Sequence, residues 1–332
     1  MSQLALQEAP TTALEDFVTV TKAAADRLRA LVLRVLKSDS FGVLELCSIF
    51  DMAQPALSHH LKVLHQAGLV TRHREGNSVF YSRRVHLDDA SARALYANLF
   101  ANIDDLPLDA DIETRLEAVY AHRRTSSEAF FASNADALAS QQTLISPSAA
   151  YLESMVSAWR HADGARQDAL EIGPGDGELL AHLAQDYTRV LGIDSTPGML
   201  TAARSRCADL DNVELANREF EALAREPRFD LIAAAMVVHH MPSPARFFRH
   251  AAALLRPGGL LLVAELVQHD QEWVRDACGD TWLGFETPTL LEWATDAGLI
   301  AHEPDFLAQK NGFRIQTLSF HNPQTSSSGE PT

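Results

Sequence analysis

Cysteine is scarce in this chain, which has three cysteines among 332 residues. Cys47, Cys207 and Cys278 lie far apart in sequence and form none of the short spacings that are typical of metal sites. We therefore expect no metal site. So few cysteines also argue against a disulfide framework and fit a reducing cytoplasm.

Long apolar segments are absent as well. The longest apolar runs, at residues 231–238 and 259–264, are well short of the ~20 residues that a membrane helix needs. The first ten residues lack the basic start and the apolar stretch of a secretion signal. We therefore expect a cytoplasmic protein that does not contact a membrane.

Positive charge is also in deficit, with 28 Lys and Arg against 44 Asp and Glu and a net charge of −16. The deficit is uneven, because residues 14–100 carry eleven basic and nine acidic side chains. Local charge matters more than the total, since salt screens fields beyond ~8 Å. The N-terminal third is therefore suited to nucleic acid, whereas the acidic remainder is not.

The length suffices for about two domains of ~150 residues. We predict disordered tails at residues 1–13 and 321–332, helices and a short hairpin at 14–103, and a helical linker and cap at 104–165. From residue 166 to 320 the pattern alternates strand and helix, which indicates a parallel sheet covered by helices. A hairpin at 306–320 would add an antiparallel edge strand.

Residues 43–70 read as two helices joined by a tight turn. Pro55 suits the first position of the second helix, because proline has no N–H to leave unpaired there. Leu57, Leu61 and Leu64 recur at helical spacing and should face a core. Polar side chains long enough to reach base edges and phosphates in a major groove share the opposite face. They are Gln54, Ser58, His59 and Lys62.

A hairpin at residues 69–84 follows and carries a row of arginines suited to phosphates or the minor groove. These are Arg72, Arg74, Arg83 and Arg84. The next helix, at 87–100, carries more apolar surface than one small domain is expected to hide, so we predict a dimer seam there. Its apolar residues are Leu95, Tyr96, Leu99 and Phe100. The alternative is a helical dimerisation module that does not contact DNA.

Residues 45–70 and the hairpin at 73–81 resemble winged-helix repressors of the ArsR type. The resemblance implies a homodimer that binds double-stranded operator DNA, with one recognition helix for each half-site of a palindrome. Metal-sensing members carry two cysteines on the helix before the turn. Here Cys47 stands alone, and a lone cysteine is more often a small apolar filler than a ligand.

A glycine-rich turn follows the strand predicted at residues 169–172. Gly173 and Gly175 fit the dinucleotide fingerprint G-x-G-x-x-G, but the third glycine, Gly177, comes one residue early, which disfavours NAD. About twenty residues on, Asp194 ends a second strand. Its carboxylate offers two acceptor oxygens, which suit the two hydroxyls of a ribose.

Residues 168–320 resemble class I S-adenosylmethionine-dependent methyltransferases, near the ubiquinone- and menaquinone-biosynthesis-like group. The resemblance implies a Rossmann-like α/β fold with a mostly parallel seven-stranded sheet and an antiparallel edge strand. It also implies S-adenosylmethionine or S-adenosylhomocysteine as cofactor. The residues that it assigns to the cofactor are Glu171, Gly173, Gly175, Gly177, Asp194, Ser195, Met199, Glu219, Phe220, Ala235 and Met236. Glu219 stands where the family usually has Asp.

Catalytic residues are harder to predict from the sequence, because methyl transfer needs an aligned nucleophile and exclusion of water more than a dedicated acid or base. His239 and His240 follow the fourth strand and are catalytic candidates, since histidine can accept a proton near neutral pH. The alternative is structural hydrogen bonding in the loop. Arsenic as substrate is excluded, because it would need several clustered thiolates.

The sequence thus predicts a two-domain DNA-binding transcriptional regulator, a repressor, fused to a cofactor-binding methyltransferase fold. Methionine-cycle genes would be natural targets, given the expected ligand. The alternative is an active methyltransferase for a small-molecule acceptor, whose winged helix regulates its own operon or holds a dimer together.

Overall fold

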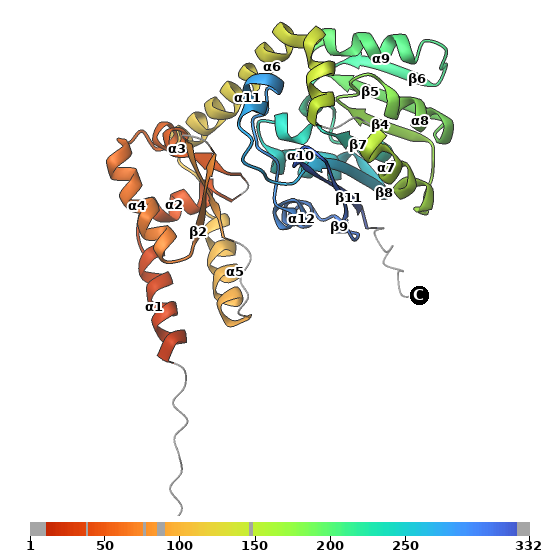
Figure 1. The fold of residues 1–332 in the computed structure, drawn as a ribbon. Helices are drawn as coiled ribbons and strands as arrows, with labels where there is room; N and C mark the ends of the chain where they lie inside the picture. The colour runs from red at the N-terminus through yellow and green to blue at the C-terminus, as the bar shows by residue number, and fades with distance from the viewer. Residues whose placement is uncertain (1–10, 38, 76–77, 85–89, 146–148, 324–332) are drawn as a thin grey trace, which may run out of the picture. The chain divides into compact units, whose positions relative to one another are not determined.

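The computed structural model describes residues 11–37, 39–75, 78–84, 90–145 and 149–323 (Figure 1). Most of the two predicted tails lies outside the described residues. Within them, α1 begins at Thr11 and β11 ends at His321. The chain divides into two compact units, residues 1–120 and 121–332. The division falls within one long helix.

The first unit is a helix-turn-helix followed by a hairpin, as predicted. Its elements are α1 (Thr11–Ala24), α2 (Arg27–Val35), β1 (Phe41–Gly42), α3 (Val43–Phe50), α4 (Gln54–Gln66), β2 (Val70–Glu75), β3 (Ser78–Arg83), α5 (Ala90–Asp104) and the start of α6 (Ala110–Ile145). Strands β1, β3 and β2 form an antiparallel sheet in that order. Asp51 adopts a left-handed conformation (φ 50°) that ends α3, and Pro55 lies in the first turn of α4. The turn between the two helices is therefore built from local signals.

The core of this unit includes two of the four apolar residues of the predicted dimer seam on α5. Leu57, Leu61 and Leu64 are fully buried, as their spacing predicts. Tyr96 and Phe100 are also buried, and the Tyr96 hydroxyl donates to the backbone oxygen of Ala67 (2.9 Å). Because α5 packs against α2, these two aromatic side chains belong to the core of their own unit and are not exposed. Leu95 and Leu99 are only half-buried, so a dimer seam that involves them stays a prediction.

The second unit is an α/β sandwich whose sheet runs in the order β10-β11-β8-β7-β4-β5-β6, with β9 beside β11. Its strands are β4 (Asp168–Ile172), β5 (Arg189–Asp194), β6 (Val213–Asn217), β7 (Phe229–Ala235), β8 (Leu255–Leu266), β9 (Ile300–Ala301), β10 (Asp305–Ala308) and β11 (Arg314–His321). Its helices after α6 are α7 (Ala149–His161), α8 (Glu178–Asp186), α9 (Leu200–Arg206), α10 (Pro244–Leu254), α11 (Trp273–Cys278) and α12 (Thr287–Asp296). Strands β4 to β8 are parallel and β11 is antiparallel to β8, which confirms the predicted class.

Helices cover both faces of this sheet (Figure 1). Leu260 and Leu262 of β8 share a core with α7 and α8. Leu261 points to the opposite face, since side chains alternate along a strand. Phe320, the partner of Leu261 on β11, contacts Phe248 of α10 there, with ring centroids 5.6 Å apart.

Strand β4 marks the switch point of the sheet, because it pairs in parallel with β5 on one side and with β7 on the other. Connections leave a switch point in opposite directions, which opens a crevice beyond the carboxyl ends of the strands. The loops that follow Ile172, Asp194 and Ala235 therefore meet at one edge.

A network of charged side chains around two buried aspartates stabilises the opposite edge. Asp168 accepts hydrogen bonds from Arg189 Nε (2.6 Å) and Arg256 Nη2 (2.8 Å). Asp230 accepts from the backbone nitrogens of Gln167 and Asp168, at 2.9 Å each, and pairs with Arg256. The bond from Arg189 is the main reason that the pKa of Asp168 is lowered. These contacts tie together the beginnings of β4, β5, β7 and β8.

We predict that Asp168→Asn lowers the free energy of unfolding of this unit by about 1–3 kcal/mol at pH 7, because two arginines lose a charged partner. The lowered pKa means that the ionised form stabilises the fold above the unfolded-state pKa of ~3.9 and that this contribution disappears as the pH falls through the folded-state pKa. The gap between variant and parent should therefore shrink below about pH 4.

The measurement is urea unfolding followed by tryptophan fluorescence, since all four tryptophans lie in the second unit. Asp209→Asn, at an exposed position after α9, is the control and should change the stability by less than ~0.5 kcal/mol. Equal stability of Asp168→Asn and the parent at pH 7 would contradict the role of this network.

Candidate functional site

The loop between β4 and α8 has a backbone that only glycine adopts easily. Gly175 and Gly177 have φ values of +52° and +80°, a region that is strained for residues with a Cβ. A Cβ on Gly177 would lie 2.9 Å from the Cα of Ala203 in α9, so this glycine allows close packing of the loop. Nothing lies within 4 Å of a Cβ built on Gly175, so the space above that residue is open to a ligand.

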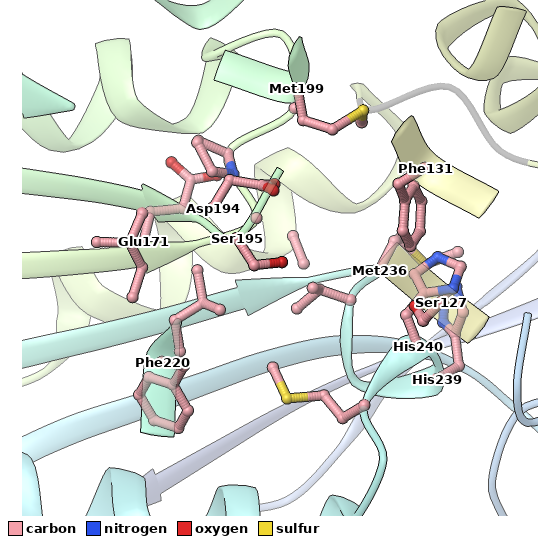
Figure 2. A pocket seen from close by; sticks show the side chains of 18 of the residues that line it. Ser127, Phe131, Glu171, Asp194, Ser195, Met199, Phe220, Met236, His239 and His240 are labelled. Carbon is pink, nitrogen blue, oxygen red and sulfur yellow. The ribbon is translucent and has the colours of Figure 1, made fainter. Parts of the chain in front are cut away.

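A cavity of about 630 Å³ lies at this edge of the sheet (Figure 2). Its volume falls within the range of small-molecule sites, which is roughly 300–1,000 Å³. The structure brings ten of the eleven predicted cofactor residues to its wall, and only Gly177 lies outside it. The ten are Glu171, Gly173, Gly175, Asp194, Ser195, Met199, Glu219, Phe220, Ala235 and Met236.

Asp194 ends β5 and lies in the wall of the cavity. Its Oδ1 accepts a hydrogen bond from the backbone nitrogen of Thr196 (2.7 Å). Burial raises the pKa of the Asp194 carboxyl to about 6, and this hydrogen bond offsets only part of that effect. At pH 7 the group is therefore mostly ionised and can accept hydrogen bonds from hydroxyl groups.

Glu171, near the end of β4, is buried in the wall of the same cavity. Its Oε2 atom accepts no hydrogen bond from the described residues. Burial, and then the charge of Asp176, raise the pKa of Glu171 well above its usual value. A buried carboxyl oxygen without a donor is uncommon in proteins and calls for a specific explanation, such as a bound ligand. A cationic group beside Glu171 would restore its ionised form.

Other predicted cofactor residues line the cavity as well, and Met236 lies toward the two histidines (Figure 2). Glu219 lies near Arg124 of α6, with Oε2 and Nη1 3.9 Å apart, and Phe220 is buried against Phe247. Met236 follows β7 with a φ of +55°, and its backbone nitrogen donates to Ala264 (2.8 Å). Such a conformation costs a methionine on the order of 1–3 kcal/mol and is most often found at functional sites.

The two histidines lie at the other end of the cavity in a short 3₁₀ turn, Val238–His240 (Figure 2). His239 Nδ1 donates to Glu265 Oε1 of β8 at 2.5 Å. Burial lowers the pKa of His239, but the charges of Glu265 and Asp280 outweigh it and raise the value to about 9. The pKa of His240 is well below its usual value, because of its burial and the neighbouring His239 charge. One imidazole of the pair is thus cationic and the other neutral.

Sequence reasoning did not single out two residues at this end. Ser127 comes from α6, and Asp280 from the loop after α11. They lie far from the glycine loop in sequence, and no motif marks them. Only the tertiary fold brings them beside His239 and His240.

The predicted DNA-contacting residues divide into two groups. Gln54, His59 and Lys62 lie exposed on α4, and Ser58 is half-buried beside them. On the hairpin, the exposed arginines are Arg72, Arg74 and Arg84. This placement leaves one face of α4 and part of the hairpin available to a nucleic acid.

Arg83 is a correction to the sequence-based expectation. Its side chain is only 6% exposed and is paired with Asp104 of α5. Its Nε donates to the backbone oxygen of Leu33 (2.7 Å), and its guanidinium lies over the ring of Phe100 at 4.5 Å. Arg83 therefore fastens β3 to α2 and α5 and is not exposed for DNA contact.

Comparison with known proteins assigns a family to a segment of each unit. Residues 26–72 match the family model of the bacterial regulatory protein, arsR family, and residues 170–261 match that of a methyltransferase domain. No helix in the described part of the chain is long and apolar enough to cross a membrane.

Curated relatives match the second unit. A ubiquinone biosynthesis O-methyltransferase from Alkalilimnicola ehrlichii is 30% identical over 148 residues, which cover 40% of this chain and 60% of the relative. Another from Coxiella burnetii is 26% identical over 145 residues, or 39% and 62% of the two chains. The chain thus spans less than two thirds of the length of either relative.

Two solved structures are also similar to this chain. The N-methyltransferase NodS from Bradyrhizobium japonicum, in complex with S-adenosyl-L-homocysteine, is 22% identical with a TM-score of 0.44, over 52% of this chain and 84% of NodS. A putative methyltransferase from Bacillus halodurans is 15% identical with a TM-score of 0.44, over 52% and 98% of the two chains. From the two family matches, this chain joins a helix-turn-helix domain of the bacterial arsR regulatory family to a methyltransferase domain.

Proposed function

We propose that the protein is a DNA-binding transcriptional repressor whose second unit binds S-adenosylmethionine or S-adenosylhomocysteine as its signal. The observation that supports this most strongly is the convergence of ten of the eleven predicted cofactor residues on one cavity. The match of residues 170–261 to a methyltransferase domain supports the same ligand class.

The polar groups of the cavity suit the chemistry of this ligand. The Asp194 carboxylate would accept hydrogen bonds from the two ribose hydroxyls, which is the role of the acidic residue at this strand end in nucleotide-binding sheets. Glu171, with its buried Oε2, would receive the cationic amino group of the methionine part. The open space above Gly175 would let the ligand approach the backbone closely.

The first unit supports operator binding through α4 and the hairpin. An exposed polar helix face would enter the major groove, while the exposed arginines Arg72, Arg74 and Arg84 would contact phosphates. We propose a homodimer that places one α4 in each half-site of a palindrome. To regulate transcription, the ligand must bind the DNA-bound and free states with different affinities. Methionine-cycle genes are the proposed targets, because they control the supply of this ligand.

We predict that the affinity for S-adenosylhomocysteine falls about tenfold between pH 7.5 and pH 5. Protonation of Asp194, whose pKa is raised to about 6, removes the acceptor of the ribose hydroxyls at the lower pH. Calorimetric titration at several pH values measures the effect. Glu171, Asp176, Arg218 and Glu219 also line this cavity and carry ionisable groups, so a matched variant is needed to isolate Asp194.

Asp194→Asn is that variant. It should bind S-adenosylhomocysteine weakly, and the part of the pH dependence of affinity that comes from Asp194 should be lost. Asp209→Asn, at an exposed position outside the cavity, should behave like the parent. Parent-like affinity in Asp194→Asn, or a parent affinity that is the same at pH 5 and pH 7.5, would be incompatible with this ribose site.

Methyl transfer to a small-molecule acceptor is the second candidate function. It is favoured by the far end of the cavity, where the residues assigned to the cofactor give way to buried or half-buried polar and aromatic side chains. These include Ser127, Phe131, His239 and His240. Bound S-adenosylmethionine supplies a methyl group on a sulfonium, and the chain would align an acceptor, exclude water and take up the acceptor's proton at the buried polar end.

If the protein catalyses transfer, incubation with methyl-labelled S-adenosylmethionine and a small-molecule extract should give a labelled product. The product should be lost in Asp194→Ala and retained in Asp209→Asn. If the protein binds the cofactor tightly but gives no labelled product with any extract fraction, the methyltransferase function is rejected and the ligand-sensing function stands.

A further inference from the structure

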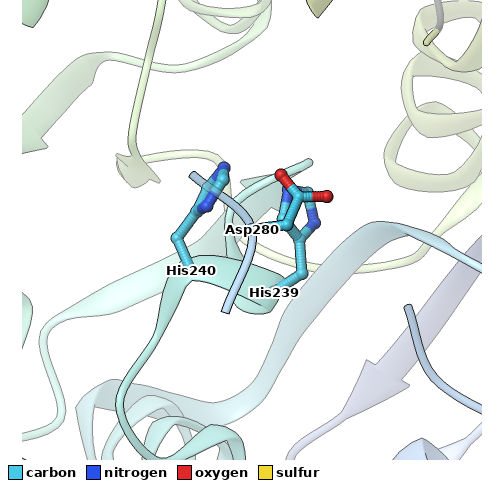
Figure 3. Close-up of side chains that lie close together, drawn as sticks. All are labelled: His239, His240 and Asp280. Carbon is cyan, nitrogen blue, oxygen red and sulfur yellow. The ribbon is translucent and has the colours of Figure 1, made fainter. Parts of the chain in front are cut away.

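Three buried side chains with metal-ligating atoms meet at the far end of the cavity (Figure 3). His239 and His240 come from the turn after β7, and Asp280 from the loop after α11. One ligand atom from each lies within 4.8 Å of those of the other two, and His239 Nε2 is 3.8 Å from Asp280 Oδ1. All three residues are at least nine-tenths buried.

The hydrogen bonds of the two imidazoles leave the same nitrogen available on each. His239 Nδ1 donates to Glu265 Oε1, and His240 Nδ1 is 3.2 Å from the backbone oxygen of Gly279. With Nδ1 engaged in this way, Nε2 is the nitrogen left for a ligand, and binding of an ion by His239 would release the proton that this nitrogen carries in the cationic ring. Metal-ligating histidines almost always have this arrangement, in which a carboxylate or carbonyl orients the ring.

The polar atoms that face this point lack other partners. Neither carboxylate oxygen of Asp280 accepts a hydrogen bond from the described residues, and His240 Nε2 likewise has none. Leaving a buried polar group unsatisfied costs ~1–3 kcal/mol, and more for a charged one. Several such atoms at one point therefore require a common explanation.

We propose that His239, His240 and Asp280 form a binding site for a divalent transition-metal ion. Two imidazoles and one carboxylate are a ligand set for Fe²⁺, and also suit Zn²⁺ or Co²⁺, with positions left open for other ligands. Ligand atoms on one tetrahedral ion lie roughly 3.4 Å apart, so atoms that now lie up to 4.8 Å apart would approach each other by up to about 1.4 Å. Glu265 is a positioning residue that fixes the ring of His239.

The open positions of the ion would face the cavity, since all three side chains line it. The class of ligand suited to them is a small molecule with an anionic or ionisable oxygen. This last step rests on the proposed small-molecule function of the cavity, whereas binding of the ion does not.

The test is titration of the chelator-treated, full-length protein with Co²⁺, followed by visible absorption. We expect one tightly bound Co²⁺ per chain, with ligand-field bands and no thiolate charge-transfer band. His240→Gln and Asp280→Asn should lose this ion, and Glu265→Gln should bind it about 10–100-fold more weakly. His182→Ala, on α8 outside the cavity, should bind like the parent.

Thermal unfolding by circular dichroism shows which variants are folded, and two independent ligand variants keep the test decisive if one fails to fold. Absence of stoichiometric binding by the parent would overturn the proposal. Parent-like affinity in folded His240→Gln or Asp280→Asn would also overturn it, because the ion would then lie on other histidines. The readout is independent of methyl transfer and of cofactor binding, so failure here leaves the proposed function standing.

Discussion

The position of β4 at the switch point of the sheet is the constraint on which the second unit depends. Strands β5 and β7 flank β4 on opposite sides, so the loops after β4, β5 and β7 leave the sheet in different directions. The crevice between these loops forms the cavity. The loop after β4 can close over this edge only with a left-handed backbone, which its glycines allow. The charged network around Asp168 at the opposite edge holds the strands in the register that this arrangement needs.

Burial of acidic groups gives the cavity its chemistry. Glu171 and Asp194 lie at one end and Asp280 at the other, where Glu265 is buried behind His239. The pKa values of Glu171, Asp194 and Asp280 are raised chiefly by burial. Keeping carboxyl groups in such a site costs free energy unless cationic or hydrogen-bonding partners compensate. A ligand with a cationic amino group and ribose hydroxyls would supply those partners at one end, and a divalent ion at the other.

Local patterns predicted much of this structure. The leucine spacing of α4, Pro55 and the glycine loop each depend on residues close in sequence, and the structure contains the elements that they predict. The predictions that Arg83 contacts DNA and that Tyr96 is exposed in a dimer seam were wrong, because the burial of both depends on packing between elements distant in sequence. Asp280 carried no signal at all, since it approaches His239 only through the tertiary fold.

The central claim is that a ligand of the second unit controls DNA binding by the first. The most direct measurement is operator affinity, determined by fluorescence anisotropy at fixed salt, while S-adenosylmethionine or S-adenosylhomocysteine is titrated into the full-length protein. The account predicts that at least one of the two changes the dissociation constant by about 5–150-fold, the usual range of allosteric coupling. An operator affinity that is the same at saturating concentrations of both would contradict it.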